Sequence, residues 1–84
     1  MLLLLEDDPA IAEAVRFALA REGFDVQHCA WLHEARAQLQ RELPELMILD
    51  VGLPDGSGLD LCRELRADAR TRHLPVIMLS ARSE

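Results

Sequence analysis

The sequence predicts an α/β domain built on a doubly wound parallel sheet. Two runs, Leu2–Leu5 and Leu46–Leu49, are wholly apolar without period-two alternation, which is typical of strands buried on both faces. Segments with helical periodicity separate such runs, and this alternation implies right-handed crossovers with helices on both faces of the sheet. Half of the 84 residues are hydrophobic, so we expect a single domain over residues 1–84.

The first strand is expected at Leu2–Leu5 and is followed by an acidic segment. Asp8 before Pro9 is typical of an N-cap followed by proline at the first helical position. The helix that follows has an apolar stripe made of Ile11, Ala14, Val15, Ala18 and Leu19. Gly23 is expected to end this helix in the left-handed conformation, and Phe24 to fold back onto its last turn.

The second strand is expected at Phe24–Cys29, where the alternating pattern is typical of a strand near the sheet edge. A second helical stripe follows, made of Leu32, Ala35, Leu39 and Leu43. This helix must end before Pro44, because the residue before a proline resists the α conformation. Leu46–Leu49 then forms the central strand.

The Gly/Pro-rich run after Asp50 predicts a loop. A third helix is expected to begin near Ser57 or Gly58, with its apolar stripe at Leu61, Cys62 and Leu65. The polar segment 66–73 is predicted as a loop with solvated arginines, and Val76–Leu79 as the last strand.

Composition excludes several classes of function. The net charge of −6 argues against nucleic-acid binding by this segment, and no run is long enough to cross a membrane. Leu2–Leu5 is too short for a signal peptide, and the residues that follow it are acidic, which is the wrong flanking charge. Cys29 and Cys62 lack metal-binding spacing, so we expect reduced thiols in a cytoplasmic protein. All nine Lys/Arg positions are arginine, and no lysine occurs.

Acidic residues follow two of the predicted buried strands. Asp50 is either a turn former or a group placed at the carboxyl end of the central strand, where open α/β sheets bind ligands. If the first and central strands are neighbours, Glu6, Asp7 and Asp50 converge there. Three carboxylates at one place repel each other, and all-oxygen ligation favours a hard cation, with Mg²⁺ the best candidate. Asp8 fits a helix cap better than a ligand, and Glu6 or Asp7 could instead complement the helix dipole.

Taken together, these motifs resemble the receiver domain of two-component response regulators, with the CheY-like, or flavodoxin-like, fold. The matching motifs, in order, are Glu6-Asp7-Asp8, Asp50, Leu53-Pro54, Gly58 and Ser80-Ala81. The sequence around Asp50 and Ser80 is most similar to that of the OmpR/PhoB-type transcriptional regulators. The resemblance implies the strand order 2-1-3-4.

The resemblance also implies a role for each acidic residue. Asp50 would be the phosphoacceptor, attacking a phosphohistidine of a sensor histidine kinase. Asp7 would bind Mg²⁺ directly, Glu6 or Asp8 through water, and the main-chain carbonyl of Gly52 would be a further ligand. The domain would assist its own phosphorylation and would not be an enzyme otherwise.

The family continues past the position of Ser80-Ala81 with a fourth helix, a fifth strand bearing a Lys-Pro pair and a last helix. We therefore expect residues 1–84 to form the N-terminal portion of the domain. Ser80 would donate its hydroxyl to a phosphoryl oxygen, a bond that contributes roughly 1.5–3 kcal/mol. Inverting a two-state equilibrium from 1:99 to 99:1 takes about 5.5 kcal/mol. Without a lysine, the chain is expected to bind metal more readily than it signals.

Further expectations concern partners. Val76–Leu79 would be an open sheet edge, which favours self-association or domain exchange. DNA would be bound only through a domain outside residues 1–84. One alternative is a receiver-like interaction module that is never phosphorylated. A Mg²⁺-dependent phosphohydrolase of the haloacid dehalogenase type is disfavoured, because the segment after the first strand lacks the D-x-D pair.

Overall fold

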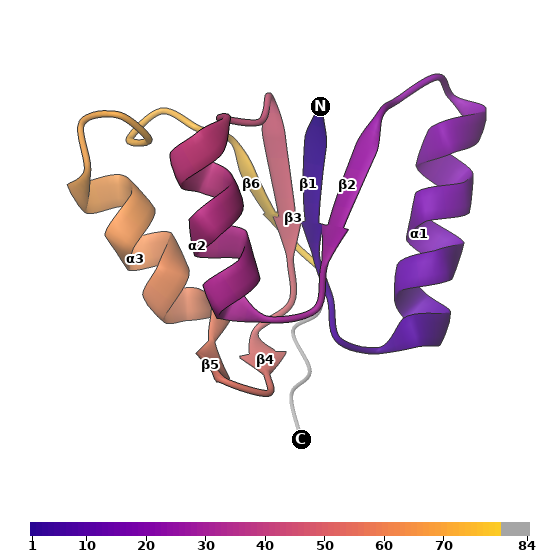
Figure 1. Cartoon of the computed structure of the whole chain (residues 1–84), viewed down its shortest axis with the longest axis horizontal. Coiled ribbons are helices and arrows are strands. Elements are labelled where there is room, and N and C mark those ends of the chain that lie inside the picture. The colour runs from indigo at the N-terminus through magenta and orange to yellow at the C-terminus, as the bar shows by residue number, and fades with distance from the viewer. Residues whose placement is uncertain (80–84) are drawn as a thin grey trace.

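The computed structural model describes residues 1–79, which form a parallel four-stranded sheet with helices on both faces (Figure 1). The sheet has the order β2-β1-β3-β6, and all of its pairs are parallel, which confirms the predicted order 2-1-3-4. Its strands are β1 (Leu2–Leu5), β2 (Val26–Cys29), β3 (Leu46–Leu49) and β6 (Val76–Met78). The helices are α1 (Pro9–Arg21), α2 (Leu32–Arg41) and α3 (Gly58–Ala67).

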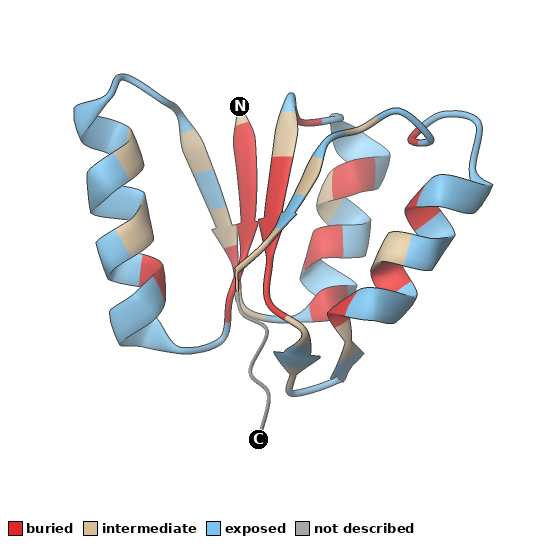
Figure 2. Ribbon diagram, turned by 180° about the vertical axis from the view of Figure 1, so that it is seen from behind, coloured by how far each residue is buried: buried red, intermediate tan, exposed pale blue. Residues whose placement is uncertain are grey.

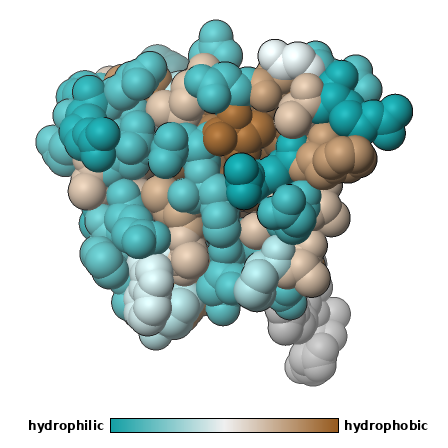
Figure 3. Space-filling view, turned by 45° about the vertical axis from the view of Figure 1, so that its right-hand side comes forward, coloured by the Kyte–Doolittle hydropathy of each residue, from teal (hydrophilic) through white to brown (hydrophobic). Residues whose placement is uncertain are grey.

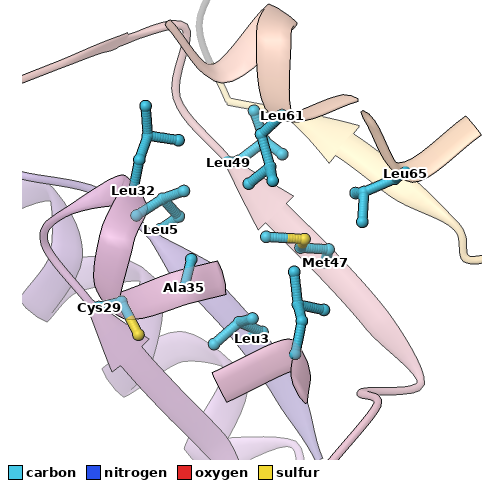
Figure 4. Close-up of a cluster of buried hydrophobic side chains, with 10 residues drawn as sticks. Leu3, Leu5, Cys29, Leu32, Ala35, Met47, Leu49, Leu61 and Leu65 are labelled. Carbon is cyan, nitrogen blue, oxygen red and sulfur yellow. The ribbon is translucent and has the colours of Figure 1, made fainter. Parts of the chain in front are cut away.

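The main hydrophobic core lies between the sheet and the pair α2 and α3. Side chains of β1 and β3 point toward the apolar faces of these helices, and Leu32 lies beside Leu5 (Figure 4). The core contains Leu3, Leu5, Cys29, Leu32, Ala35, Leu39, Met47, Leu49, Leu61 and Leu65. The predicted stripes of α2 and α3 are therefore largely confirmed, and Cys29 and Cys62 are free thiols.

A smaller core lies on the opposite face, where α1 is the helix that covers the sheet (Figure 2). Leu4 and Ile48 pack there against Ala12, Val15 and Leu19. The prediction for α1 is wrong in part, since Ile11, Ala14 and Ala18 are exposed. The reason is that α1 is apolar on most of its circumference, so spacing alone does not select the face that meets the sheet.

Large apolar side chains are also exposed on this side of the molecule. Phe17 of α1 is 64% exposed, and Phe24 is 48% exposed. Figure 3 shows that hydrophilic side chains dominate this view and that apolar ones lie among them in small groups. Phe17 and Phe24 belong to one such group, since both line the same shallow hollow beside Ala20 and Val26.

Both ends of α1 have the expected caps. The Asp8 carboxylate accepts hydrogen bonds from Ala10 N (2.9 Å) and Ile11 N (3.3 Å), and Gly23 adopts a positive φ of 91°. The Phe24 amide donates to Leu19 O at 3.1 Å. Because the Phe24 amide is used in this turn, β2 begins at Val26 and not at Phe24 as predicted, although Asp25 O already accepts a hydrogen bond from Leu2 N (2.8 Å).

The other helices differ from prediction at their ends. α2 ends at Arg41, before Pro44 as required, and leaves Leu43 outside the helix and exposed. α3 extends to Ala67, into the predicted loop. Two arginines of that segment are not merely solvated. Arg66 donates to the carbonyls of residues 72 and 74, and Arg70 to that of residue 39, so both hold the loop in place.

The segment predicted as a loop after Asp50 contains a short antiparallel hairpin, β4 (Gly52–Leu53) paired with β5 (Gly56–Ser57). Gly/Pro-rich composition indicated the turn but not the pairing. Within residues 1–79, no helix has the length and hydrophobicity needed to cross a membrane.

Candidate metal centre

The register of the parallel strands brings the acidic residues together. Leu5 of β1 pairs with Leu49 of β3, so Glu6 and Asp50 leave the sheet side by side at its carboxyl edge. The sheet pattern continues one step further, since Asp50 N donates to Leu5 O (3.0 Å) and Glu6 N donates to Cys29 O (3.0 Å). The backbones that carry the two carboxylates are thus fixed by hydrogen bonds to neighbouring strands.

Three carboxylates form a cluster at this edge. One oxygen from each of Glu6, Asp7 and Asp50 lies within 4.8 Å of the others. Glu6 and Asp50 are buried, at 2% and 3% exposed, whereas Asp7 is exposed. Among the described residues, none of the salt bridges involves these three acids. The cluster therefore concentrates negative charge in a partly buried place without a protein cation.

The electrostatics of Glu6 reflect this concentration. Burial raises the pKa of its carboxyl, the hydrogen bond from Asp8 N to Oε2 (2.9 Å) lowers it, and the charges of Asp50, Asp7 and Asp8 raise it again. The net result is a pKa above the usual value for glutamate. Ionisation of Glu6 therefore costs more in the folded chain than in the unfolded one, and a bound positive charge would lower that cost.

The donor set fits a hard divalent cation. The cluster offers carboxylate oxygens only, without a sulfur or imidazole ligand among the grouped side chains. Oxygen ligands from few protein groups suit Mg²⁺, which keeps several of its waters. Close carboxylates can also occur without a metal, but the burial of two of the three favours charge compensation.

The remaining predicted site residues lie in different positions. The Asp8 carboxylate caps α1 and lies outside the three-acid cluster. Gly52 is the first residue of β4, two positions after Asp50 and exposed, and its role as a main-chain ligand stays a prediction. Ser80 and Ala81 lie outside the described residues.

The loop that follows Asp50 is packed tightly onto it. Asp50 Oδ1 accepts a hydrogen bond from Val51 N (2.8 Å), and Gly58 N donates to Val51 O (2.6 Å). A Cβ at Gly58 would collide with the main-chain carbonyl of Asp50 and with Leu49 Cδ1 (2.6 Å). Only glycine permits this approach of α3 to the end of β3.

Two residues near the site were missed from the sequence. Nε2 of His28 lies 2.8 Å from the main-chain oxygen of Glu6, because β2 pairs with β1 in register. Asp55, between β4 and β5, accepts hydrogen bonds from the first amides of α2. A signal for Asp55 existed, since Trp31 precedes α2 and its indole has no acceptor with which to cap a helix.

Comparison with known proteins agrees with this geometry. The phosphate regulon transcriptional regulatory protein PhoB of Rhizobium meliloti (strain 1021) is 46% identical over 81 residues, which is 96% of this chain and 36% of PhoB. A putative response regulator from Chloroflexus aurantiacus J-10-fl superposes with a TM-score of 0.93 at 36% identity, covering 99% of this chain and 68% of that one. The MaeR response regulator bound to beryllium trifluoride has a TM-score of 0.89 at 32% identity, covering 99% and 68%.

The chain spans about a third of the length of the curated relatives it matches and about two thirds of the solved receiver chains. The family model for the response regulator receiver domain matches residues 2–84. The sequence motifs, the sheet order and the acidic cluster agree with that match. The chain belongs to the response regulator receiver domain family.

Proposed function

We propose that this chain is a phosphoacceptor domain, which receives a phosphoryl group on Asp50 from a phosphohistidine of a sensor histidine kinase. The observation that carries the proposal is the cluster of Glu6, Asp7 and Asp50, whose oxygens lie within 4.8 Å at the carboxyl edge of a receiver sheet. Family membership supports the reaction class, and the buried, backbone-anchored position of Asp50 supports its choice as acceptor.

In the proposed reaction a carboxylate oxygen of Asp50 attacks phosphorus. An O–P bond forms, and the N–P bond of the phosphohistidine breaks with its electron pair moving to the imidazole. The Val51 amide, 2.8 Å from Oδ1, orients the carboxylate before attack. Because phosphoryl transfer depends mostly on positioning and charge neutralisation, the fixed backbones of Glu6 and Asp50 are well suited to it.

Glu6, Asp7, Asp50 and the main-chain carbonyl of Gly52 would hold Mg²⁺, with Asp8 a weaker candidate through water. When bound, the ion would neutralise the phosphoryl oxygens and so permit an anionic carboxylate to approach them. Ser80, outside the described residues, is proposed to donate its hydroxyl to a phosphoryl oxygen.

Treatment with acetyl phosphate tests the proposal. With Mg²⁺ the wild-type chain is expected to gain the mass of one phosphoryl group, and Asp50→Asn to gain none, because the amide lacks the nucleophilic oxygen. Asp60→Asn is a matched control, since Asp60 is exposed and paired with Arg63 on α3. No mass gain in wild type would favour the alternative of an unphosphorylated interaction module, and an undiminished gain in Asp50→Asn would count against Asp50 as the acceptor.

We further propose that the phosphorylated domain controls transcription in the cytoplasm through a DNA-binding region outside residues 1–84. Several relatives are named as transcriptional regulators, and this chain spans only about a third of their length. The negative charge of the chain itself is unfavourable for contact with DNA.

Self-association through β6 is proposed for the 84-residue chain. Within the described sheet, β6 pairs on one side only, with β3, and Ile77 is 51% exposed. An edge strand with an apolar side chain favours pairing with a second copy. Sedimentation equilibrium is expected to show dimers, and Ile77→Lys to shift the chain toward monomer. A wild-type monomer at all concentrations would contradict the proposal.

A further inference from the structure

The β4–β5 hairpin contacts α2 through Asp55, the residue before β5. Its Oδ1 accepts a hydrogen bond from Leu32 N (2.8 Å), and its Oδ2 accepts one from His33 N (3.1 Å). These amides begin α2 and have no intrahelical acceptor. Asp55 thus caps α2 from 23 residues further along the chain, in a place where the N-cap residue Trp31 makes no side-chain cap bond.

The pKa of Asp55 is consistent with a persistent contact. Desolvation is the largest single influence and raises it, but the hydrogen bonds from the amides of Leu32, His33 and Asp55 and the charge of His33 together outweigh desolvation, and the result lies below the usual value for aspartate. The hairpin also packs on α2 beside these bonds. A Cβ at Gly56, where φ is +151°, would come within 2.7 Å of Leu32 Cδ1.

The same hairpin is continuous with the metal centre. β4 begins two residues after Asp50, and the intervening Val51 donates to Asp50 Oδ1 while its carbonyl accepts from Gly58 N. Any displacement of β4 therefore moves the group that orients the Asp50 carboxylate. The hairpin thus has two attachments, one to the acidic cluster and one to the N-terminus of α2.

We propose that Asp55 is a positioning residue, which holds the β4–β5 hairpin on α2 and thereby fixes the backbone after Asp50 in the geometry that binds Mg²⁺. This inference rests on the proposed function of the cluster as a magnesium-dependent phosphoacceptor site. Coupling between two equilibria is reciprocal, so Mg²⁺ binding strengthens the contact of Asp55 with α2 by the same factor that the contact strengthens Mg²⁺ binding.

Glu34 provides a matched control at the same helix end. Its Oε1 accepts hydrogen bonds from Ala30 N (3.0 Å) and Trp31 N (3.3 Å), all within one segment of chain. Glu34→Ala and Asp55→Ala each remove two bonds between a carboxylate and backbone amides near the start of α2. Only Asp55→Ala detaches the hairpin, so the pair separates loss of helix capping from loss of positioning.

A third variant separates positioning from charge. Asp55→Ala and Asp55→Asn remove the same negative charge, but the asparagine Oδ1 still accepts the bond from Leu32 N. If Asp55 acts through its hydrogen bonds, Asp55→Asn is expected to lie between wild type and Asp55→Ala. If it acts through its charge alone, the two variants are expected to bind Mg²⁺ equally.

The experiment is a Mg²⁺ titration of each chain followed by amide NMR. In wild type, the Leu32 and His33 amides are expected to shift with the same midpoint as the Glu6 and Val51 amides. Asp55→Ala is expected to raise the Mg²⁺ dissociation constant about tenfold and Asp55→Asn about threefold, within the usual range of coupling. Glu34→Ala is expected to change it less than twofold.

Several results would overturn the inference. The first is that the amide shifts of Leu32 and His33 stay unchanged in wild type saturated with Mg²⁺. The others concern the Mg²⁺ dissociation constant: a wild-type value in Asp55→Ala, an equal increase in both Asp55 variants, or an increase in Glu34→Ala equal to that in Asp55→Ala. Failure of the proposed function has a different signature, because the Glu6 and Val51 amides of wild type would then not respond to Mg²⁺ at all.

Discussion

Gly58→Ala is expected to destabilise the domain by about 3 kcal/mol, at the upper end of the usual cost of overpacking. The added methyl group would occupy the space of the Asp50 carbonyl and of Leu49 Cδ1, and the Asp50 carbonyl is main chain that cannot rotate away. α3 must therefore move away from the end of β3. Urea unfolding, read as a shift of the midpoint at constant slope, measures the loss.

Gly52→Ala is the matched control for stability, because it changes a glycine of the same loop. No atom lies within 4 Å of a Cβ built at Gly52, and its φ is not in the left-handed region. Its free energy of unfolding is expected to stay within about 0.5 kcal/mol of wild type. Equal midpoints for Gly58→Ala and wild type would show that the approach of α3 to β3 is less constrained than the structure indicates.

Asp50→Asn is expected to stabilise the metal-free domain by about 1–2 kcal/mol at neutral pH, because it removes one charge from three neighbouring carboxylates. The asparagine Oδ1 can still accept the hydrogen bond from Val51 N. Burial raises the pKa of Glu6 most, and the charges of Asp50, Asp7 and Asp8 raise it further. Since its folded pKa lies above the unfolded one, metal-free wild type loses stability as pH rises from below 4.5 through that raised pKa.

Mg²⁺ is expected to reverse the order of stability, so that wild type becomes more stable than Asp50→Asn. At one hundred times its dissociation constant a ligand adds about 2.7 kcal/mol to wild type, and Asp50→Asn should gain much less. Urea unfolding at pH 7 with and without Mg²⁺ measures both effects. Asp25→Asn is the control, because Asp25 precedes β2 at the opposite end of the sheet. Equal stabilisation of wild type and Asp50→Asn by Mg²⁺ would argue against the cluster as the binding site.

The sequence predicted best those elements whose pattern of apolar residues fits only one placement in the fold. The all-leucine run of β1 and the run of β3 are buried on both faces, so their bounds were confirmed at both ends. α1 was harder, because Ile11 and Ala12 are both apolar and only packing against Leu4 and Ile48 selects Ala12. The start of β2 was misplaced because the turn at Gly23 uses residues that continue the alternating pattern.

At the site, the approach of Glu6, Asp7 and Asp50 followed from their positions after neighbouring strands, once the strand order was known. The contact of Asp55 with Leu32 and His33 did not follow, because it joins segments far apart in the sequence. Local rules treat Asp55 as a turn residue, and the missing acceptor at Trp31 was the one indication that a cap must come from elsewhere.

If the acidic cluster binds Mg²⁺ as proposed, the pairing of Leu5 with Leu49 would give the metal a part in folding as well as in chemistry. If β3 slipped by one residue, its apolar run would still form a strand, but every side chain would turn to the opposite face. The Asp50 carboxylate would then point away from Glu6. Mg²⁺ would bind such a misaligned sheet poorly, so the ion would favour the correctly aligned sheet over the sheet in which β3 is shifted by one residue.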